Sequence, residues 1–395
     1  MHSIKEIETR MKGMQDIKHL LRSVRAMSAI RWRKAKKHLE MAQEYAKLVD
    51  GQLGIVFTKF GTRLSKNISH QGILKSGNPR LLSIDELSGK ALVVTVSLLG
   101  SPASRGTRIT PGDQTSALEL FEERLGKKVD AFISCENGAV STINGWLLSA
   151  LTGRPVLDAP GNGRAHPMGM MGSMGLEKRK GYQTIQAFAG GDPKKGRHVL
   201  GVVEGTLETT APIIRTAADS TNGLIVVIRH PVSISYVKRH GAPGAIRDAI
   251  EAGRIIRETR GRGGLAVGRA LAERFHGKII DENVVTETTL SQKGGFDIGK
   301  VHLKGDNTIH FLNEYLIHEC RGRRRASFPD LIVTLDQKTG LPLSSGEMKK
   351  GCRVILLYVP ARYLKLGSGV KNPDNYLPLE KILAKPLKRY VRIST

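Results

Sequence analysis

The sequence predicts an α/β protein: a three-layer α/β sandwich followed by a β-barrel-like domain, with a long N-terminal helix. Three observations lead to this prediction. Residues 1–48 are free of proline and carry apolar side chains at helical spacing. Apolar strands then alternate with amphipathic helices between residues 81 and 260. Short strands separated by Gly, Asp and Asn follow between residues 261 and 363.

The first 48 residues are predicted to form one basic helix. Ser3 and Glu6 would form a capping box at its start. Apolar residues recur every three or four positions, at Ile4, Ile7, Met11, Met14, Ile17, Leu21, Val24, Met27 and Ile30. A single narrow stripe on so long a helix favours a coiled-coil partner, so we expect this helix to pair with another helix. Residues 49–80 are rich in Gly and Ser and are predicted to be a linker.

The same N-terminal segment, SIKEIETRMKGMQDIKHLLRSVRAMSAIRWRKAKKHLEMAQEYA, resembles the opening helix of the γ subunit of F-type ATP synthases. In that family the helix pairs with a long C-terminal helix to form the rotor shaft. Here Pro378 and Pro386 interrupt the C-terminal segment, which predicts no such helix. A rotor or assembly protein is therefore one alternative function. A fused segment without a specific partner is the other explanation of the resemblance.

Composition narrows the class of protein and of partner. The net charge of +26 favours anionic partners, but aromatic residues make up only 5% of the chain. Because no nucleic-acid reading motif accompanies the charge, we expect no specific nucleic-acid partner. No apolar stretch approaches the roughly 20 residues of a membrane-spanning helix, and the N-terminus lacks the apolar core of a secretory signal. The cysteines form no CxxC pair, which favours a reducing compartment, so we expect a cytoplasmic protein.

The region 81–260 is predicted to form a largely parallel sheet with helices on both faces, because its strands and helices alternate. The predicted strands are 91–96, 131–135, 155–158 and 224–228. The predicted helices are 115–125, 144–151, 208–221 and 242–256.

The region 261–363 has a different pattern that predicts a compact barrel-like domain. Its predicted strands are 278–280, 284–289, 300–303, 308–312, 331–335 and 353–359. Residues 364–395 are predicted to be a C-terminal tail.

Polar residues follow the second and third predicted strands, and ligands of open α/β sheets bind beyond such strand ends. Three of them, Glu136, Asp158 and His166, are the candidate catalytic residues. We expect Glu136 or Asp158 to activate water and His166 to protonate a leaving group. Arg164 would hold the negative charge of a substrate. A structural turn with an internal Asp–Arg pair is the alternative explanation of this loop.

The remaining candidate site residues would bind and orient a substrate: Asn137, Asn144, Asn313, Glu314 and Asp297. We expect no cofactor. A metal ion held by His166 with Asp158, or with the distant acids Glu314 and Asp330, stays open, although no HxH or HExxH spacing supports it. Cys135 is more typical of a buried strand residue than of a nucleophile.

A series of motifs appears in one order along the chain: CENGAVSTIN, RPVLDAPGNGRAHP, GAPGAIRDAI, GGFDIG, NEY, FPDLIVTLDQKTG and GCRVILL. In this series, residues 81–362 resemble the S-methyl-thiohydantoin desulfurase family. The resemblance implies an α/β sandwich followed by a β-barrel domain. It also implies a hydrolase that removes sulfur, as a thiol, from a five-membered thiohydantoin ring and leaves a hydantoin. The expected partner is a small anionic heterocycle, and a homo-oligomer is left open.

Two departures from the family pattern bear on activity. His166 and Met168 stand where the family usually has Phe and an acid, which indicates a divergent subtype with another substrate. The γ-like helix and the linker stand where the family has a Gly-rich N-terminal loop. A catalytically inactive fusion is therefore a further alternative.

Overall fold

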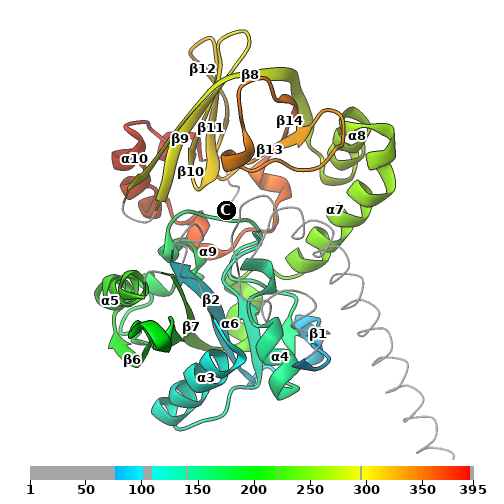
Figure 1. The fold of residues 1–395 in the computed structure, drawn as a ribbon. Coiled ribbons are helices and arrows are strands. Elements are labelled where there is room, and N and C mark those ends of the chain that lie inside the picture. The colour runs from blue at the N-terminus through cyan, green and yellow to red at the C-terminus, as the bar shows by residue number, and fades with distance from the viewer. Residues whose placement is uncertain (1–75, 101–108, 139–140, 222, 294–295, 392–395) are drawn as a thin grey trace, which may run out of the picture.

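The described residues fold into two domains. Figure 1 shows the α/β domain in its lower half and the antiparallel β domain in its upper half. This computed structural model describes residues 76–100, 109–138, 141–221, 223–293 and 296–391. The predicted N-terminal helix and nearly all of the predicted linker lie outside these residues.

The α/β domain is built on a seven-stranded sheet with the strand order β1-β4-β3-β2-β7-β5-β6. β1, β4, β3 and β2 run parallel, whereas β7, β5 and β6 are each antiparallel to their neighbours. The strands are β1 (Leu81–Leu82), β2 (Leu92–Gly100), β3 (Ala131–Ser134), β4 (Val156–Leu157), β5 (Thr184–Gly190), β6 (Val199–Gly205) and β7 (Leu224–Ser233).

The prediction of a largely parallel sheet is wrong, because the sheet is mixed. The sequence analysis missed β5 and β6, which form a hairpin beside β7. The connection between them is short and contains only the single turn Pro193–Lys195. A connection of that length joins antiparallel neighbours, since a parallel crossover needs a dozen residues or more.

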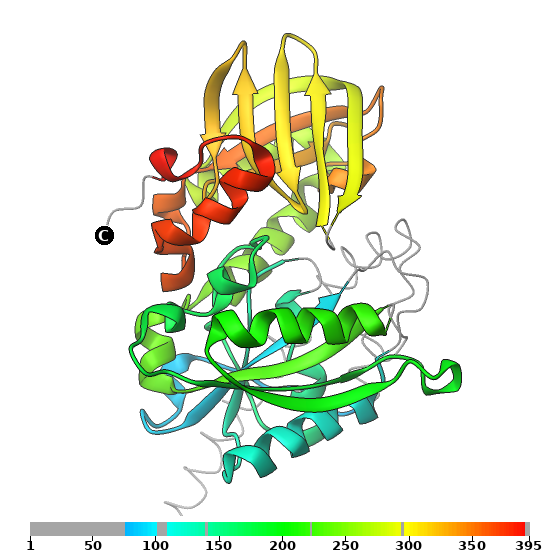
Figure 2. The ribbon, with the colours of Figure 1, turned by 90° about the vertical axis from the view of Figure 1, so that its left-hand side faces the viewer.

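Helices cover both faces of this sheet, which confirms the α/β sandwich. α3 (Pro111–Leu125) and α4 (Trp146–Thr152) pack on one face, and α5 (Leu207–Ser220) and α6 (Ile234–His240) pack on the other (Figure 2). Val94 faces the first layer, whereas its neighbour Val93 faces the second, as alternation along a strand requires. Within the described ranges, no helix is both long and apolar enough to cross a membrane.

The second domain is a curled antiparallel sheet of seven strands in the order β12-β11-β10-β9-β8-β14-β13. The strands are β8 (Lys278–Lys293), β9 (Phe296–Leu303), β10 (Asn307–Leu312), β11 (Glu314–Cys320), β12 (Arg323–Ser327), β13 (Leu331–Asp336) and β14 (Arg353–Val359). The first half of β8 pairs with β14 and the second half with β9, so the sheet curls around an apolar interior. This half-barrel agrees with the predicted barrel-like domain, although β11 and β12 were not predicted.

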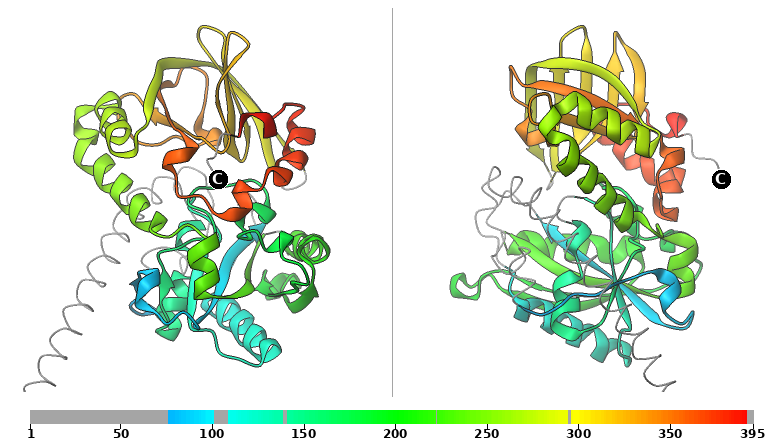
Figure 3. Two further views of the ribbon diagram at one scale, coloured as in Figure 1. Left: turned by 180° about the vertical axis from the view of Figure 1, so that it is seen from behind. Right: turned by 90° about the vertical axis from the view of Figure 1, so that its right-hand side faces the viewer.

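One helix joins the two domains. α7 (Ala245–Thr259) starts against the α/β domain, where Asp158 Oδ1 accepts a hydrogen bond from the backbone N–H of Ile246 at 2.8 Å. Its far end packs with α8 (Gly264–Phe275) on the outer face of the half-barrel, where Ile256 meets Leu357. Figure 3 shows the two helices bridging the domains from behind. The change from one domain to the other therefore falls within α7.

The C-terminal segment, predicted to be a tail, is folded through residue 391. It contains the short helices α9 (Ser368–Lys371) and α10 (Leu377–Leu383); in Figure 1, α10 lies beside the half-barrel and α9 lies between the two domains. Tyr376 is fully buried, in a cluster that also holds Met171 of the α/β domain and Phe328 of the half-barrel. This segment thus contributes to the contact between the domains.

In one close contact between the α/β domain and the C-terminal segment, two backbone segments lie against each other. The loop of Gly161, Asn162 and Gly163 runs against the segment from Lys365 to Gly367, and the N–H of Gly367 donates to Asn162 Oδ1 at 3.0 Å. A methyl group at Gly163 would overlap the carbonyl of Lys365. Only glycine therefore allows this approach.

We predict that Gly163→Ala destabilises the protein, because the two backbone segments must move apart. Over-packing of this kind costs about 1–3 kcal/mol of unfolding free energy, which chemical denaturation of the purified variant would measure. Gly169→Ala is the matched control, since nothing lies within 4 Å of a methyl group added there. Equal stability of the two variants would contradict the close contact.

Candidate functional site

The polar residues of the site meet where the two domains face each other. Glu136 lies just beyond the carboxyl end of β3, and Arg164 and His166 lie on the loop that follows β4. Glu314 is the first residue of β11 and comes from the half-barrel. The structure thus brings together six of the nine predicted site residues from positions far apart in the sequence: these four, and Asn137 and Asn313 in the cavity described below.

Glu136 and His166 form the first contact of the site. Glu136 Oε2 accepts a hydrogen bond from the backbone N–H of His166 at 2.9 Å and lies 3.3 Å from His166 Nε2. The imidazole packs closely against Gly172, where an added methyl carbon would lie 2.7 Å from Nε2. Burial lowers the pKa of His166, and Glu136 opposes this only in part. The imidazole of His166 is therefore neutral at neutral pH.

Glu314 provides a second carboxyl group, whose pKa is raised, whereas that of His166 is lowered. Burial raises the pKa of Glu314, and the nearby charge of Glu136 raises it further, while Arg164 acts against both. The Oε2 atom of Glu314 is buried and has no hydrogen-bond partner among the described residues. Two carboxyl groups with separated pKa values can serve as base and acid in one reaction.

Arg164 connects the domains as well as carrying charge. Its Nη1 donates to the carbonyl oxygens of Pro329, at 2.9 Å, and Asp330. The guanidinium lies 4.5 Å from the ring centroid of Phe328. Burial lowers the pKa of Arg164 to about 10, so the side chain stays cationic at neutral pH. It therefore both fixes the loop and places a positive charge near Glu136 and Glu314.

Asp158, a predicted catalytic residue, binds the backbone at the start of α7. Its Oδ1 accepts backbone N–H groups of Ile246 and Arg247 at 2.8 and 3.3 Å, and its Oδ2 lies 3.2 Å from Arg247 Nε. The side chain is buried, and burial raises its pKa. Acceptance of orphan N–H groups by an acid at a helix N-terminus is a stabilising contact. These contacts favour a capping role for Asp158 over a catalytic one.

The predicted orienting residues divide into two groups. Asn137 and Asn313 line a cavity between the domains together with Glu314. Asn137 Nδ2 donates to the carbonyl of Ala245 at 2.7 Å. The Oδ1 atom of Asn137 is buried and has no hydrogen-bond partner among the described residues. Asn144 is buried, and neither it nor Asp297 belongs to the described lining of this cavity. Asp297 instead binds Asn313, whose Oδ1 accepts the Asp297 N–H at 2.9 Å.

Arg229 was missed by the sequence analysis. It lies on β7, is 8% exposed, and its charge acts on both Cys135 and Glu136. Its Nε has no hydrogen-bond partner among the described residues. The signal in the sequence is an arginine that directly follows the apolar run LIVVI. Burial raises the pKa of the neighbouring Cys135 to about 11, which agrees with a buried thiol rather than a nucleophile.

The cavity between the domains has a volume of about 540 Å³. Asn137, Arg164, Asn313 and Glu314 form its polar end, and α7, α8, β13 and β14 contribute its other walls. Glu136 stands behind this end, since a methyl carbon added to Gly138 would lie 3.6 Å from Glu136 Oε1 and 3.3 Å from the side chain of Ala165. Cavities of this size hold small organic ligands in other proteins.

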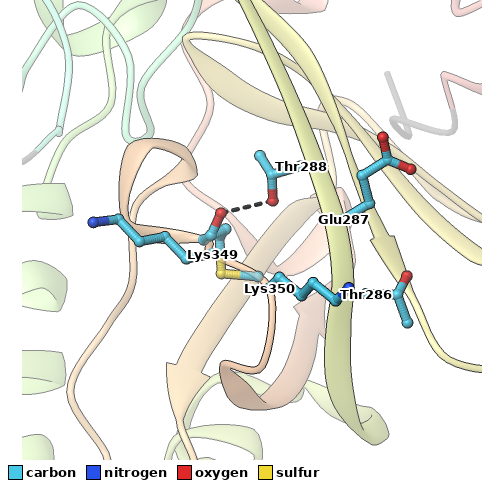
Figure 4. Close-up of a pocket in the computed structure, with 6 residues that line it drawn as sticks. Thr286, Glu287, Thr288, Lys349 and Lys350 are labelled. Carbon is cyan, nitrogen blue, oxygen red and sulfur yellow. Dashed lines mark hydrogen bonds between the residues drawn. The ribbon is translucent and has the colours of Figure 1, made fainter.

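A second hollow, of about 640 Å³, opens on the surface of the half-barrel (Figure 4). It is lined by Thr286, Glu287, Thr288, Met348, Lys349 and Lys350. Thr288 Oγ1 already donates to the carbonyl of Met348 at 2.6 Å. None of the predicted site residues lies there, so the cavity between the domains is the candidate site.

The charges at the polar end define what the site can do. Glu136 beside the neutral His166 can accept a proton from water, a protonated Glu314 can donate one, and Arg164 can hold an anion. Among the residues that the structure describes, no three His, Cys, Asp or Glu side chains are grouped to hold a metal ion.

Comparisons with known proteins agree with this architecture. A family model described as "S-Me-THD-like, N-terminal domain" matches residues 61–198, and one described as "S-Me-THD-like, C-terminal domain" matches residues 206–365. The first match starts within the segment predicted to be a linker. A search of curated proteins found no match.

A solved structure is similar in fold. It is a crystal structure of a protein from Chromobacterium violaceum, with 18% sequence identity and a TM-score of 0.58. The alignment covers 78% of this chain and 84% of that chain. At this identity the similarity shows a shared fold. Because the two family models together cover most of the sequence, the chain belongs to the S-Me-THD-like family.

Proposed function

We propose that the protein is a hydrolase that removes a thiol from an S-methyl-thiohydantoin-like ring bound in the cavity between the domains. The observation that supports this most directly is the pair of unlike carboxyl groups. Glu136 lies beside a neutral His166, and Glu314 holds its proton more tightly than an exposed glutamate. Membership of the family supports the class of ring.

The polar end of the cavity suits such a ring. A hydantoin-type ring presents N–H and C=O groups at its edge, and buried polar atoms need partners. Asn137 Oδ1 and Glu314 Oε2 are buried there without partners among the described residues. Asn137 Oδ1 would accept a ring N–H, and Glu314 would donate its proton to a ring nitrogen. Arg164 would hold negative charge on the ring, and Arg229 would act on the charge of Glu136.

The proposed reaction uses one water molecule. Glu136 takes a proton from the water, whose oxygen bonds to the ring carbon that carries the methylthio group. Glu314 donates its proton to the neighbouring ring nitrogen, which gives a neutral tetrahedral intermediate. The hydroxyl proton of this intermediate then returns to Glu314 as the C=O bond forms and the C–S bond breaks. The leaving thiolate receives the proton held by Glu136, relayed by His166, so both carboxyl groups regain their starting states.

We predict that Glu136→Gln lowers thiol release from an S-methyl-thiohydantoin by at least about 100-fold, because a general base contributes 10²–10⁴-fold. A thiol-reactive chromophore would measure the rate. Asp158→Asn is the control: loss of a buried charged cap should cost about 1–3 kcal/mol of unfolding free energy but leave turnover within a few-fold.

The opposite ranking of these two variants would assign the base to Asp158. No thiol release by the wild-type protein from a panel of S-methyl-thiohydantoins would refute the proposed activity and favour the inactive fusion.

We also predict a pH dependence that comes from Glu314. Because the folded state raises the pKa of Glu314, it binds more protons than the unfolded state above the ordinary glutamate pKa. The free energy of unfolding should therefore fall as the pH rises from the ordinary glutamate pKa through the raised pKa of Glu314. The value of kcat/KM should fall over the same range, as Glu314 loses its proton. Glu314→Gln should remove the stability slope and most of the activity. Thermal unfolding and initial rates across the pH range would measure both.

Glu319, on the same strand, is the matched control for this experiment. Burial tends to raise its pKa, but Lys385 and Arg324 more than offset burial and lower it. Its contribution to stability should therefore be present above the ordinary glutamate pKa and be lost as the pH falls. Glu319→Gln should lower stability at neutral pH and keep the slope that Glu314 causes. A slope unchanged in Glu314→Gln would refute the assignment.

A further inference from the structure

The cavity has one polar end and a long apolar remainder. Beyond Asn137, Arg164, Asn313 and Glu314, its walls are largely formed by apolar side chains from α7, α8 and the outer face of the half-barrel. Several of these are nearly fully buried, among them Ile256, Leu271, Leu335 and Leu357, each at most 6% exposed. A bare five-membered ring held at the polar end would leave most of this space empty. The apolar part therefore needs an occupant of its own.

The space exists because α7 presents small residues to it. Ala245, Ala249, Ala252 and Gly253 all line the cavity from this helix. They recur at helical spacing and so lie on one face of α7. Phe275 of α8 also lines the cavity. Because the cavity has a volume of about 540 Å³, it can hold a five-membered ring together with a group the size of a leucine or phenylalanine side chain.

The charges along the cavity argue against a charged occupant. Among the described lining residues outside the polar end, the charged side chains are Asp248 and Lys365. These two are paired with each other, with 2.7 Å between Lys365 Nζ and Asp248 Oδ2, and Lys365 also donates to the carbonyl of Gly244. A charged substituent in the cavity would find no unpaired counter-charge there, and burial of an unpaired charge is costly.

We propose that the natural substrate carries a bulky apolar substituent on its ring, of the leucine or phenylalanine side-chain class, and that this group fills the cavity between α7, α8 and β14. This inference rests on the proposed function for the identity of the ring. The ring would lie at Asn137 and Glu314, and its substituent would point toward Ala252 and Leu357. Selectivity for the substrate would then come from the domain interface rather than from the carboxyl groups.

Binding of hydantoins to the full chain tests this proposal without requiring turnover. Isothermal titration calorimetry would compare 5-methyl-, 5-isobutyl-, 5-benzyl- and 5-carboxymethyl-hydantoin. Each methylene buried in an apolar site should raise affinity by about fourfold. We expect 5-isobutyl- and 5-benzyl-hydantoin to bind at least tenfold more tightly than the methyl compound, and the carboxymethyl compound to bind most weakly. Equal affinities across the series would overturn the proposal.

Filling the cavity provides the second arm. Ala252→Phe, or the smaller change Ala252→Leu, should reduce the affinity ratio of 5-benzyl- to 5-methyl-hydantoin by tenfold or more. Ala266→Phe is the matched control, because Ala266 is half-buried on α8 but does not belong to the described lining. Thermal unfolding would confirm that each variant is folded. A ratio that is unchanged in both Ala252 variants would overturn the proposal.

The two proposals fail in different ways. Graded binding of the hydantoins without thiol release from the matching S-methyl-thiohydantoins would refute the hydrolase activity and keep the apolar-substituent site. Thiol release with no dependence of affinity on the substituent would refute the site and keep the activity.

Discussion

The bonds from Arg164 to the carbonyl groups of Pro329 and Asp330 hold the two halves of the candidate site in register. Glu136 and His166 belong to the α/β domain, whereas Glu314 belongs to the half-barrel, so the carboxyl pair exists only while the domains are in contact. The backbone contact between Gly163 and Lys365 and the buried ring of Tyr376 act at the same interface. Domain packing is thus a condition of the chemistry and not only of stability.

The interface also explains why the two carboxyl groups differ. Glu314 comes from a strand end that is covered by the other domain, and burial is the main cause of its raised pKa. Glu136 lies beyond the carboxyl end of β3, beside His166, and its charge interacts with that of Arg229. Desolvation therefore makes Glu314 hold its proton more tightly than an exposed glutamate does. This environment of Glu314 would not exist in a single domain.

The sequence predicted the apolar core of this fold better than its edges. β2 and β7 are buried on both faces, and their unbroken apolar runs predicted them directly. β6 is only half-buried, and β12 is an edge strand of arginines, so neither carries a strong apolar pattern. Strand direction was wrong for β7, which was expected in a largely parallel sheet and runs antiparallel to β2 and β5, because periodicity does not encode which neighbour a strand pairs with.

The same contrast holds for the site. Glu136, Arg164 and His166 were predicted because polar residues at strand ends are a local signal. Glu314 was predicted through the family resemblance and by its position after a strand. Arg229 was missed, since its importance depends on a neighbouring strand that sequence spacing cannot identify. Asp158 was assigned to catalysis because its partner, the start of α7, lies almost ninety residues away and was not visible in the local pattern.

The position of β7 limits how the chain can be divided. β7 belongs to the segment matched by the C-terminal family model, yet it lies in the sheet between β2 and β5, which belong to the segment matched by the N-terminal model. A fragment that ended between the two matches would expose the open edges of two central strands, and such edges pair readily with other chains. The two matched segments are therefore halves of one folding unit, and separate expression of either half should yield aggregates rather than a smaller native protein.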